Sequence, residues 1–202
     1  MLNARDRDDA GADRNDAGAG QNDAGAGQND RTESRDDRAQ SRNDTGEGRE
    51  DFDDLERFVQ AQDAGMTFAH AVAELRRGRK TSHWMWFVFP QIAGLGQSPM
   101  SKKFALSSLS QARAYLRHPV LGPRLIDCAT IVAQLQDRSA EQIFGEIDAQ
   151  KLRSSMTLFA RAAAEEAVFA QVLDRYFGGI ADPATDQRLQ TTRGNHAVRQ
   201  AN

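Results

Sequence analysis

The chain has 202 residues, one cysteine and a formal net charge of −3. A single cysteine excludes an intramolecular disulfide and a cysteine-based metal site. No apolar stretch of the kind needed for a signal peptide follows Met1, and none approaches the roughly 20 residues of a membrane span. We therefore expect a cytoplasmic protein with no membrane partner.

The first 50 residues differ in kind from the rest of the chain. They contain no aromatic side chain, and the unit Asn15-Asp16-Ala17-Gly18-Ala19-Gly20-Gln21 is repeated over residues 22–28. Such a segment buries too little apolar surface to offset a chain entropy of about 1–2 kcal/mol per residue. We predict a disordered tail over residues 1–50, one domain over 51–185, and a frayed polar end over 186–202.

The charge divides at the same place. Residues 1–50 hold 13 acidic and 8 basic side chains, which leaves a net charge of +2 on the remainder. A domain that binds nucleic acid normally carries a more basic surface, so we do not expect a nucleic-acid partner.

From residue 51 onward, the apolar residues recur at helical spacing almost throughout. Cap residues mark the expected helix starts, and glycines at 65, 78 and 178–179 mark three of the ends. No segment alternates between polar and apolar residues as a half-buried strand does. We predict an all-α, compact single domain of about seven or eight short helices, with starts near Asp51, Thr67, Ser98-Pro99, Ser110, His118-Pro119, Ser139, Asp148 and Glu165.

The aromatic stretch Ser82-His83-Trp84-Met85-Trp86-Phe87-Val88-Phe89-Pro90-Gln91 holds both tryptophans of the chain. It fits neither a helical nor a strand period, so a short buried helix and an extended segment both remain open. Pro90 ends it in either case.

The body contains several distinctive motifs. They include Ser82-His83-Trp84-Met85-Trp86-Phe87, Phe89-Pro90-Gln91, Gly94-Leu95-Gly96, Lys151-Leu152-Arg153-Ser154-Ser155-Met156, and Phe177-Gly178-Gly179. Together these motifs resemble the bacterial domain-of-unknown-function family 1810. The resemblance covers roughly residues 52–185 and implies a compact all-helical domain with no established activity. Relatives sometimes carry the label calpastatin, a calpain inhibitor that acts as a long disordered chain, which this body does not resemble.

The aromatic stretch is also the first candidate for a ligand pocket. Trp84 and Trp86 can stack on a planar base, Gln91 can orient it, and His83 can act as an acid–base catalyst. The alternative is that both indoles fill the core and His83 caps a turn.

Two further segments can supply the anion-binding end of such a pocket. Gly94 and Gly96 precede an expected helix start, where backbone N–H groups can hold a phosphate, and a plain turn is the alternative. Lys151 and Arg153 add positive charge on a later helix. Ser155 and Thr157 follow on that helix and cannot both face solvent if its apolar side is buried, so at least one must find an internal partner or line a cavity. The alternative is that their hydroxyls bond to carbonyls of their own helix.

These observations lead to two hypotheses about function. The first is that the domain binds an anionic nucleotide- or ADP-ribose-like small molecule and, if it is an enzyme, hydrolyses it with His83 as the acid–base group. The alternative is a non-catalytic protein-interaction or adaptor domain in which the aromatic stretch is core. We expect no metal and no cofactor, because no cluster of ligating residues has metal spacing.

Overall fold

The computed structural model describes residues 54–200, with side chains described up to residue 192. The predictions for residues 1–50, and for an N-cap at Asp51, therefore lie outside the described residues. Within 54–200 the elements are a helix over residues 54–63, η1 (Ala64–Met66), α2 (Thr67–Arg76), α3 (Met85–Val88), α4 (Pro99–Lys103), α5 (Leu109–Arg117), α6 (Leu121–Gln134), α7 (Ala140–Phe144), α8 (Glu146–Ala162), α9 (Ala167–Phe177) and α10 (Pro183–Gln200).

The all-α prediction is confirmed. The described residues contain no strand, and their one β-type pairing is an isolated bridge between Ile92 and Leu106. No helix within 54–200 is both long enough and apolar enough to cross a membrane.

Local cap chemistry sets several helix starts where the sequence predicts them. Ser98 accepts a hydrogen bond from the backbone N–H of Ser101, with Pro99 in the first turn of α4. Ser139 and Gln142 form a reciprocal capping box at the start of α7. Asp148 is not a cap, because α8 already begins at Glu146, and its carboxylate is free to contact other elements.

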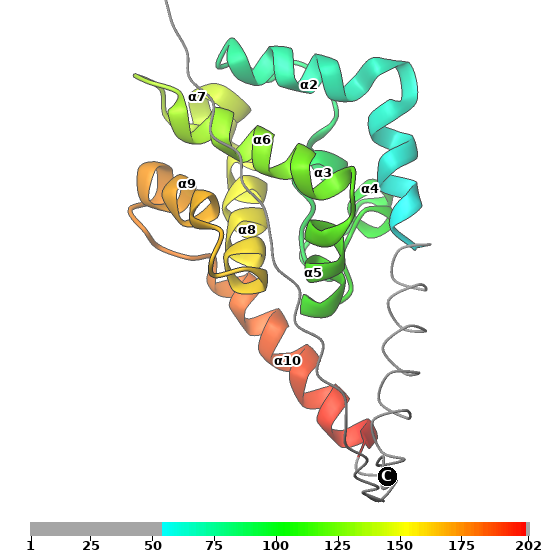
Figure 1. The fold of residues 1–202 in the computed structure, drawn as a ribbon. Coiled ribbons are helices and arrows are strands. Elements are labelled where there is room, and N and C mark those ends of the chain that lie inside the picture. Colours follow the sequence, from blue (N-terminus) through cyan, green and yellow to red (C-terminus); the bar gives the residue numbers. More distant parts are fainter. Residues whose placement is uncertain (1–53, 201–202) are drawn as a thin grey trace, which may run out of the picture.

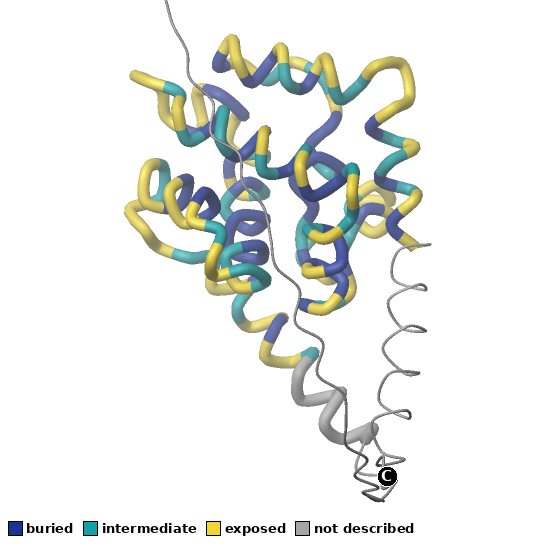
Figure 2. The backbone as a smooth tube through the Cα atoms, viewed as in Figure 1, coloured by how far each residue is buried: buried dark blue, intermediate teal, exposed yellow. Residues whose placement is uncertain are grey.

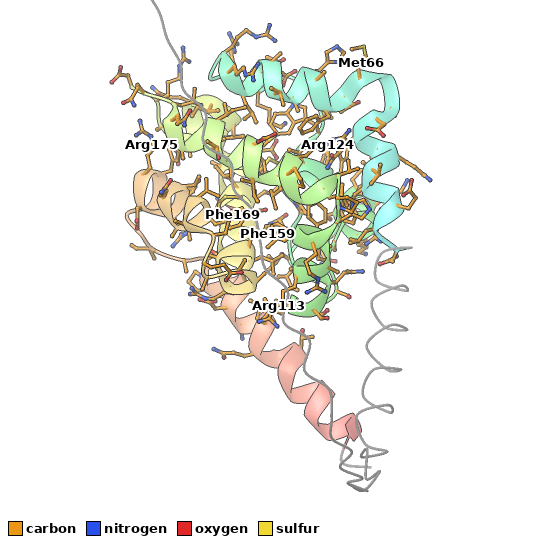
Figure 3. All side chains as sticks on the ribbon, in the orientation of Figure 1. Met66, Arg113, Arg124, Phe159, Phe169 and Arg175 are labelled. Carbon is orange, nitrogen blue, oxygen red and sulfur yellow. The ribbon has the colours of Figure 1, made fainter. Side chains whose placement is uncertain are left out.

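The centre of the domain is α8, which contacts α5, α7, α9 and α10. Figure 1 shows it in yellow between α5 and α9, with α2 crossing above. In Figure 2 its inward side is buried while the outer helices expose their far sides. The ring centroids of Phe159 on α8 and Phe169 on α9 lie 5.6 Å apart. Figure 3 labels both side chains between the two helices.

The aromatic stretch folds as the one-turn helix α3, which settles the choice that its sequence leaves open. A helix of four residues leaves most of its carbonyl groups without partners inside the helix. The carbonyl oxygen of Phe87 accepts from Gln62 Nε2 at 2.7 Å and from the Tyr115 hydroxyl at 3.1 Å. Gln62 and Tyr115 are both buried, so this polar group fixes α3 inside the core.

The polar C-terminal segment differs from the expectation of a frayed end beginning at residue 186. It forms α10, which projects from the body in Figure 1. Its first turns are anchored because Leu189 is buried and the Arg161 guanidinium pairs with both carboxylate oxygens of Asp186, at 3.0 and 3.1 Å. These two side chains thus fasten to the body a helix whose own sequence is mostly polar.

Candidate functional site

A surface hollow of about 490 Å³ lies where the first turns of α8, the segment after α3 and the start of α10 meet. Its volume is within the range of roughly 300–1,000 Å³ that small-molecule sites occupy. Four of the side chains and backbone positions expected at a ligand site line this hollow. The full lining comprises Gln91, Leu95, Gly96, Ile147, Gln150, Lys151, Arg153, Ser154, Asp182 and Ala184.

The segment after α3 is positioned by backbone pairing and by close contact. The Leu106 amide donates to Gln91 O at 2.9 Å, and the Ala93 amide donates to Leu106 O at 2.8 Å. A Cβ atom at Gly96 would lie 2.5 Å from the Ser101 side chain, so only glycine fits there without displacing it.

Gly94 belongs to the same segment but lies outside the lining of the hollow. Its φ of +91° favours glycine, and a Cβ atom there would lie 2.8 Å from the Arg188 guanidinium, which would have to move. Its carbonyl accepts a hydrogen bond from Arg188 Nη2 at 3.0 Å. Gly94 therefore forms a turn that holds α10, whereas Gly96 lines the hollow.

Two lysines and one carboxylate form the charged cluster beside the hollow. Asp148 Oδ2 lies 2.6 Å from Lys80 Nζ, and Asp148 Oδ1 lies 2.6 Å from Lys151 Nζ. The side chains are only 9% exposed in Lys80, 17% in Asp148 and 19% in Lys151, so water screens the charges on these groups weakly. Two positive charges share one negative charge, which leaves the cluster with a surplus of one.

The pKa of Asp148 records this balance. Burial raises the pKa of the carboxyl. The hydrogen bonds from Lys151 and Lys80, together with their positive charges, lower it by more, so the pKa lies below its ordinary value. The carboxylate is ionised at neutral pH. It cannot neutralise both lysines.

Three other lining residues have their polar groups paired within the described part of the chain. Arg153 donates to the carbonyl oxygens of Ile180 and Ala181, at 2.9 and 3.0 Å. Asp182 caps α10 by accepting from the backbone N–H and hydroxyl of Thr185, and it also accepts from the Ser154 hydroxyl at 2.8 Å. Of the two cationic side chains that line the hollow, Lys151 is therefore the better placed to exchange its partner for a ligand.

The two indoles occupy different environments. Trp84 is fully buried, its N–H donates to Glu74 Oε2 at 2.8 Å, and it does not line the hollow. Trp86 is partly buried, and Lys151 Nζ lies 4.6 Å from the centroid of its ring. Trp84 is thus part of the core, whereas Trp86 is in contact with the charged cluster.

The remaining two predicted residues do not reach the hollow. His83 is exposed in the turn before α3, and its side chain makes no hydrogen bond or ion pair with the described part of the chain. Ser155 is fully buried on α8, and its hydroxyl has no hydrogen-bond partner among the described residues. No group of three or more potential metal ligands occurs within the described range.

Three residues at or beside the hollow are not among those predicted from the sequence: Lys80, Asp148 and Asp182. Asp148 precedes Lys151 by three residues on one helix, a spacing that predicts an ion pair. Asp182 directly precedes Pro183, which is the signal of an N-cap followed by a first helical turn. Lys80 had no comparable signal, because its partner lies 68 residues away.

Comparisons with known proteins agree with the architecture. The model of the family described as "protein of unknown function (DUF1810)" matches residues 52–189. The chain belongs to this family. A crystal structure of a conserved hypothetical protein of Mycobacterium tuberculosis, Rv1873, is 52% identical in sequence and superimposes with a TM-score of 0.66, covering 68% of this chain and 96% of the other. No curated protein matches the chain.

The family match ends at residue 189, so the DUF1810 domain includes the first turns of α10 together with the rest of the hollow. Within this domain the hollow is lined by two cationic side chains, two amide side chains, one carboxylate, and hydroxyl and apolar groups, and Lys151 connects it to the lysine cluster with its surplus positive charge. Such a surface can hold an anion together with a partly apolar body.

Proposed function

We propose that this DUF1810 domain binds a small anionic molecule of the nucleotide or ADP-ribose class in the hollow between α8 and α10. The observation that carries the proposal is the convergence of Gln91 and Gly96 with Lys151 and Arg153, although some 55 residues separate Gly96 from Lys151. The surplus charge of the lysine cluster supplies the attraction for the anion. Lys151 is its contact with the ligand.

The proposal concerns binding, because the acid–base group that the sequence suggests is elsewhere. His83 does not line the hollow, so a hydrolytic reaction there would lack the imidazole that the sequence analysis assigns to it. The prediction of a cytoplasmic protein accompanies this proposal and is supported by the single, buried, unpaired Cys128.

The test uses the full chain with ADP, ADP-ribose and inorganic pyrophosphate in thermal-shift and calorimetric titrations. The informative variant is Lys151→Met, which keeps an apolar stem over Trp86 and leaves Asp148 paired with Lys80 alone. Loss of one charged contact, worth about 1.5–3 kcal/mol, is expected to raise the Kd by roughly 10- to 150-fold. Lys102→Met on α4 is the matched control, because this lysine is exposed and does not line the hollow.

If the parent chain binds one of these compounds but Lys151→Met and Lys102→Met weaken the binding equally, the placement of the ligand beside Lys151 is contradicted. The absence of any shift or heat with all three compounds would contradict the proposal itself.

An adaptor role is the second candidate, and a separate observation favours it. Ile147 and Ile180 are 72% and 61% exposed, and Ile147 forms part of the rim of the hollow. A contiguous exposed apolar patch marks a contact surface for another protein, whereas single exposed apolar residues are ordinary, so this candidate requires both isoleucines to belong to one patch. This candidate predicts that none of the three anions changes the melting temperature.

A further inference from the structure

Two buried polar groups near the lysine cluster have no hydrogen-bond partner among the described residues. They are the indole Nε1 of Trp86 and the hydroxyl of Ser155. Leaving a buried donor unpaired costs about 1–3 kcal/mol, and native interiors contain few such groups. These two therefore need a physical explanation.

The neighbouring hydroxyls of α8 show that Ser155 is the exception. The Thr157 hydroxyl donates to Arg153 O and accepts from the Asp182 amide, both at 2.8 Å. Ser154 donates to the Asp182 carboxylate at 2.8 Å. Ser155 is fully buried, yet it does not even bond to the carbonyl one turn before it, which is the ordinary solution for a serine inside a helix.

The two indoles show the same contrast. A lysine ammonium lies near each ring, with Lys80 Nζ 5.1 Å from the centroid of Trp84 and Lys151 Nζ 4.6 Å from that of Trp86. The Trp84 N–H also has a carboxylate acceptor, Glu74. The Trp86 ring has the Lys151 ammonium beside it, but its N–H has no acceptor among the described residues. Trp86 therefore lacks a group equivalent to the Glu74 carboxylate that pairs with Trp84.

Charge and position indicate the missing component. The cluster holds one positive charge more than Asp148 can neutralise. Lys151 lines the hollow, and Ser155 lies one turn further along the same side of α8. An acceptor that carries negative charge would satisfy the indole, the hydroxyl and the ammonium together.

We infer that Trp86 Nε1–H, Ser155 Oγ–H and the Lys151 ammonium form an inner subsite for a phosphate oxygen of the ligand. The inference rests on the proposed function and extends it, because it places the phosphate inward of the hollow, beneath the Lys151 side chain. The flexible stem of Lys151 opens and closes this subsite. The nucleoside part of the ligand then occupies the outer hollow beside Gln91.

The first experiment observes the indole groups directly in the full chain labelled with ¹⁵N. The chain has two tryptophans, so two indole N–H signals are expected, and Trp86→Phe assigns them. ADP and inorganic pyrophosphate should move the Trp86 signal downfield and slow its hydrogen exchange, whereas adenosine should not. The Trp84 signal is the internal control, because its N–H is already bonded to Glu74.

The second experiment measures affinity and stability in Ser155→Ala, with Ser110→Ala on an exposed part of α5 as its matched control. Ser155→Ala should raise the Kd for ADP about tenfold without lowering the melting temperature, because the hydroxyl contributes nothing to the unliganded fold. A serine with a purely structural role would instead lower the melting temperature and leave the Kd unchanged.

The outcomes separate the two proposals. If ADP binds with a Kd that depends on Lys151, but the Trp86 signal stays in place or Ser155→Ala binds as tightly as Ser110→Ala, the inner subsite is refuted and the outer site stands. If no phosphate compound binds the parent chain, both proposals fail.

Discussion

Replacing Glu74 by glutamine tests the account of how the turn before α3 is held. Glu74 Oε2 accepts from the backbone N–H groups of Thr81 and Ser82 and from the Trp84 indole, at 2.8, 3.1 and 2.8 Å. Burial raises the pKa of this carboxyl, but its hydrogen bonds, the Thr81 amide foremost, bring the pKa from 4.5 down to about 2. A shift of this size corresponds to about 3 kcal/mol of stability at neutral pH.

The hydrogen bonds give a similar magnitude by another route. A bond to a charged acceptor contributes about 1.5–3 kcal/mol and one to a neutral acceptor about 0.5–1.5 kcal/mol. A glutamine oxygen that keeps the three Oε2 bonds but loses the charge therefore forfeits about 1 kcal/mol per bond. Both routes predict that Glu74→Gln is about 3 kcal/mol less stable at pH 7.

The dependence on pH has a definite sign. Because folding lowers the pKa of Glu74, its contribution is complete above pH 4.5 and is lost as the pH falls toward 2. The stability of the parent chain should therefore approach that of the variant over this interval. Urea unfolding followed by far-UV circular dichroism measures both, with the exposed Glu165→Gln as the control. A difference below about 1 kcal/mol at pH 7, or one that persists unchanged to pH 2, would refute the reasoning.

Three further substitutions test other parts of the structure by the same unfolding assay. Gly122→Ala should destabilise the domain by about 3 kcal/mol or more, because its Cβ would lie 1.9 Å from Leu116 O; near-parent stability would show that α5 and α6 can separate there. Asp182→Ala removes the cap of α10 and the acceptor of the Thr185 hydroxyl, and should cost about 1–2 kcal/mol; an unchanged midpoint would contradict this cap. Asp148→Asn leaves two largely buried lysines unneutralised and should cost about 3 kcal/mol. Sulfate should restore part of the loss, whereas sodium chloride at equal ionic strength should not.

Most of the fold could be predicted from the sequence because its determinants are local. Ser98 with Pro99 and Ser139 with Gln142 define helix starts within four residues, and the structure contains both caps. Helical spacing of apolar residues then identifies the inward faces without knowledge of the partner helices. The polar segment after residue 185 was harder, because α10 depends on a few contacts with distant residues and has little apolar pattern of its own.

The site could be predicted only in part, for a related reason. Residue type alone selects Gln91 and Lys151 as ligand contacts, and both line the hollow. The aromatic stretch has large side chains on every side, so its sequence does not reveal which indole faces the core. Trp84 is turned inward because its acceptor, Glu74, lies on α2, and that pairing is invisible to local spacing.

The course of α8 explains why polar groups become buried at the candidate site. Leu152, Met156 and Phe159 form the fully buried side of this helix. Lys151 directly precedes Leu152, and Ser155 directly precedes Met156. Successive residues of an α-helix are about 100° apart around its axis, so Lys151 and Ser155 lie at the edge of the buried side and border the core. A charge held at such a border is screened less by water than one at the surface, which strengthens its attraction for an anion and raises the cost of leaving it unpaired. The course of α8 therefore accounts for the weak screening of the Lys151 charge and for the burial of the unpaired Ser155 hydroxyl. The unpaired Trp86 indole lies on α3 and reaches the same cluster from another element, through its contact with Lys151.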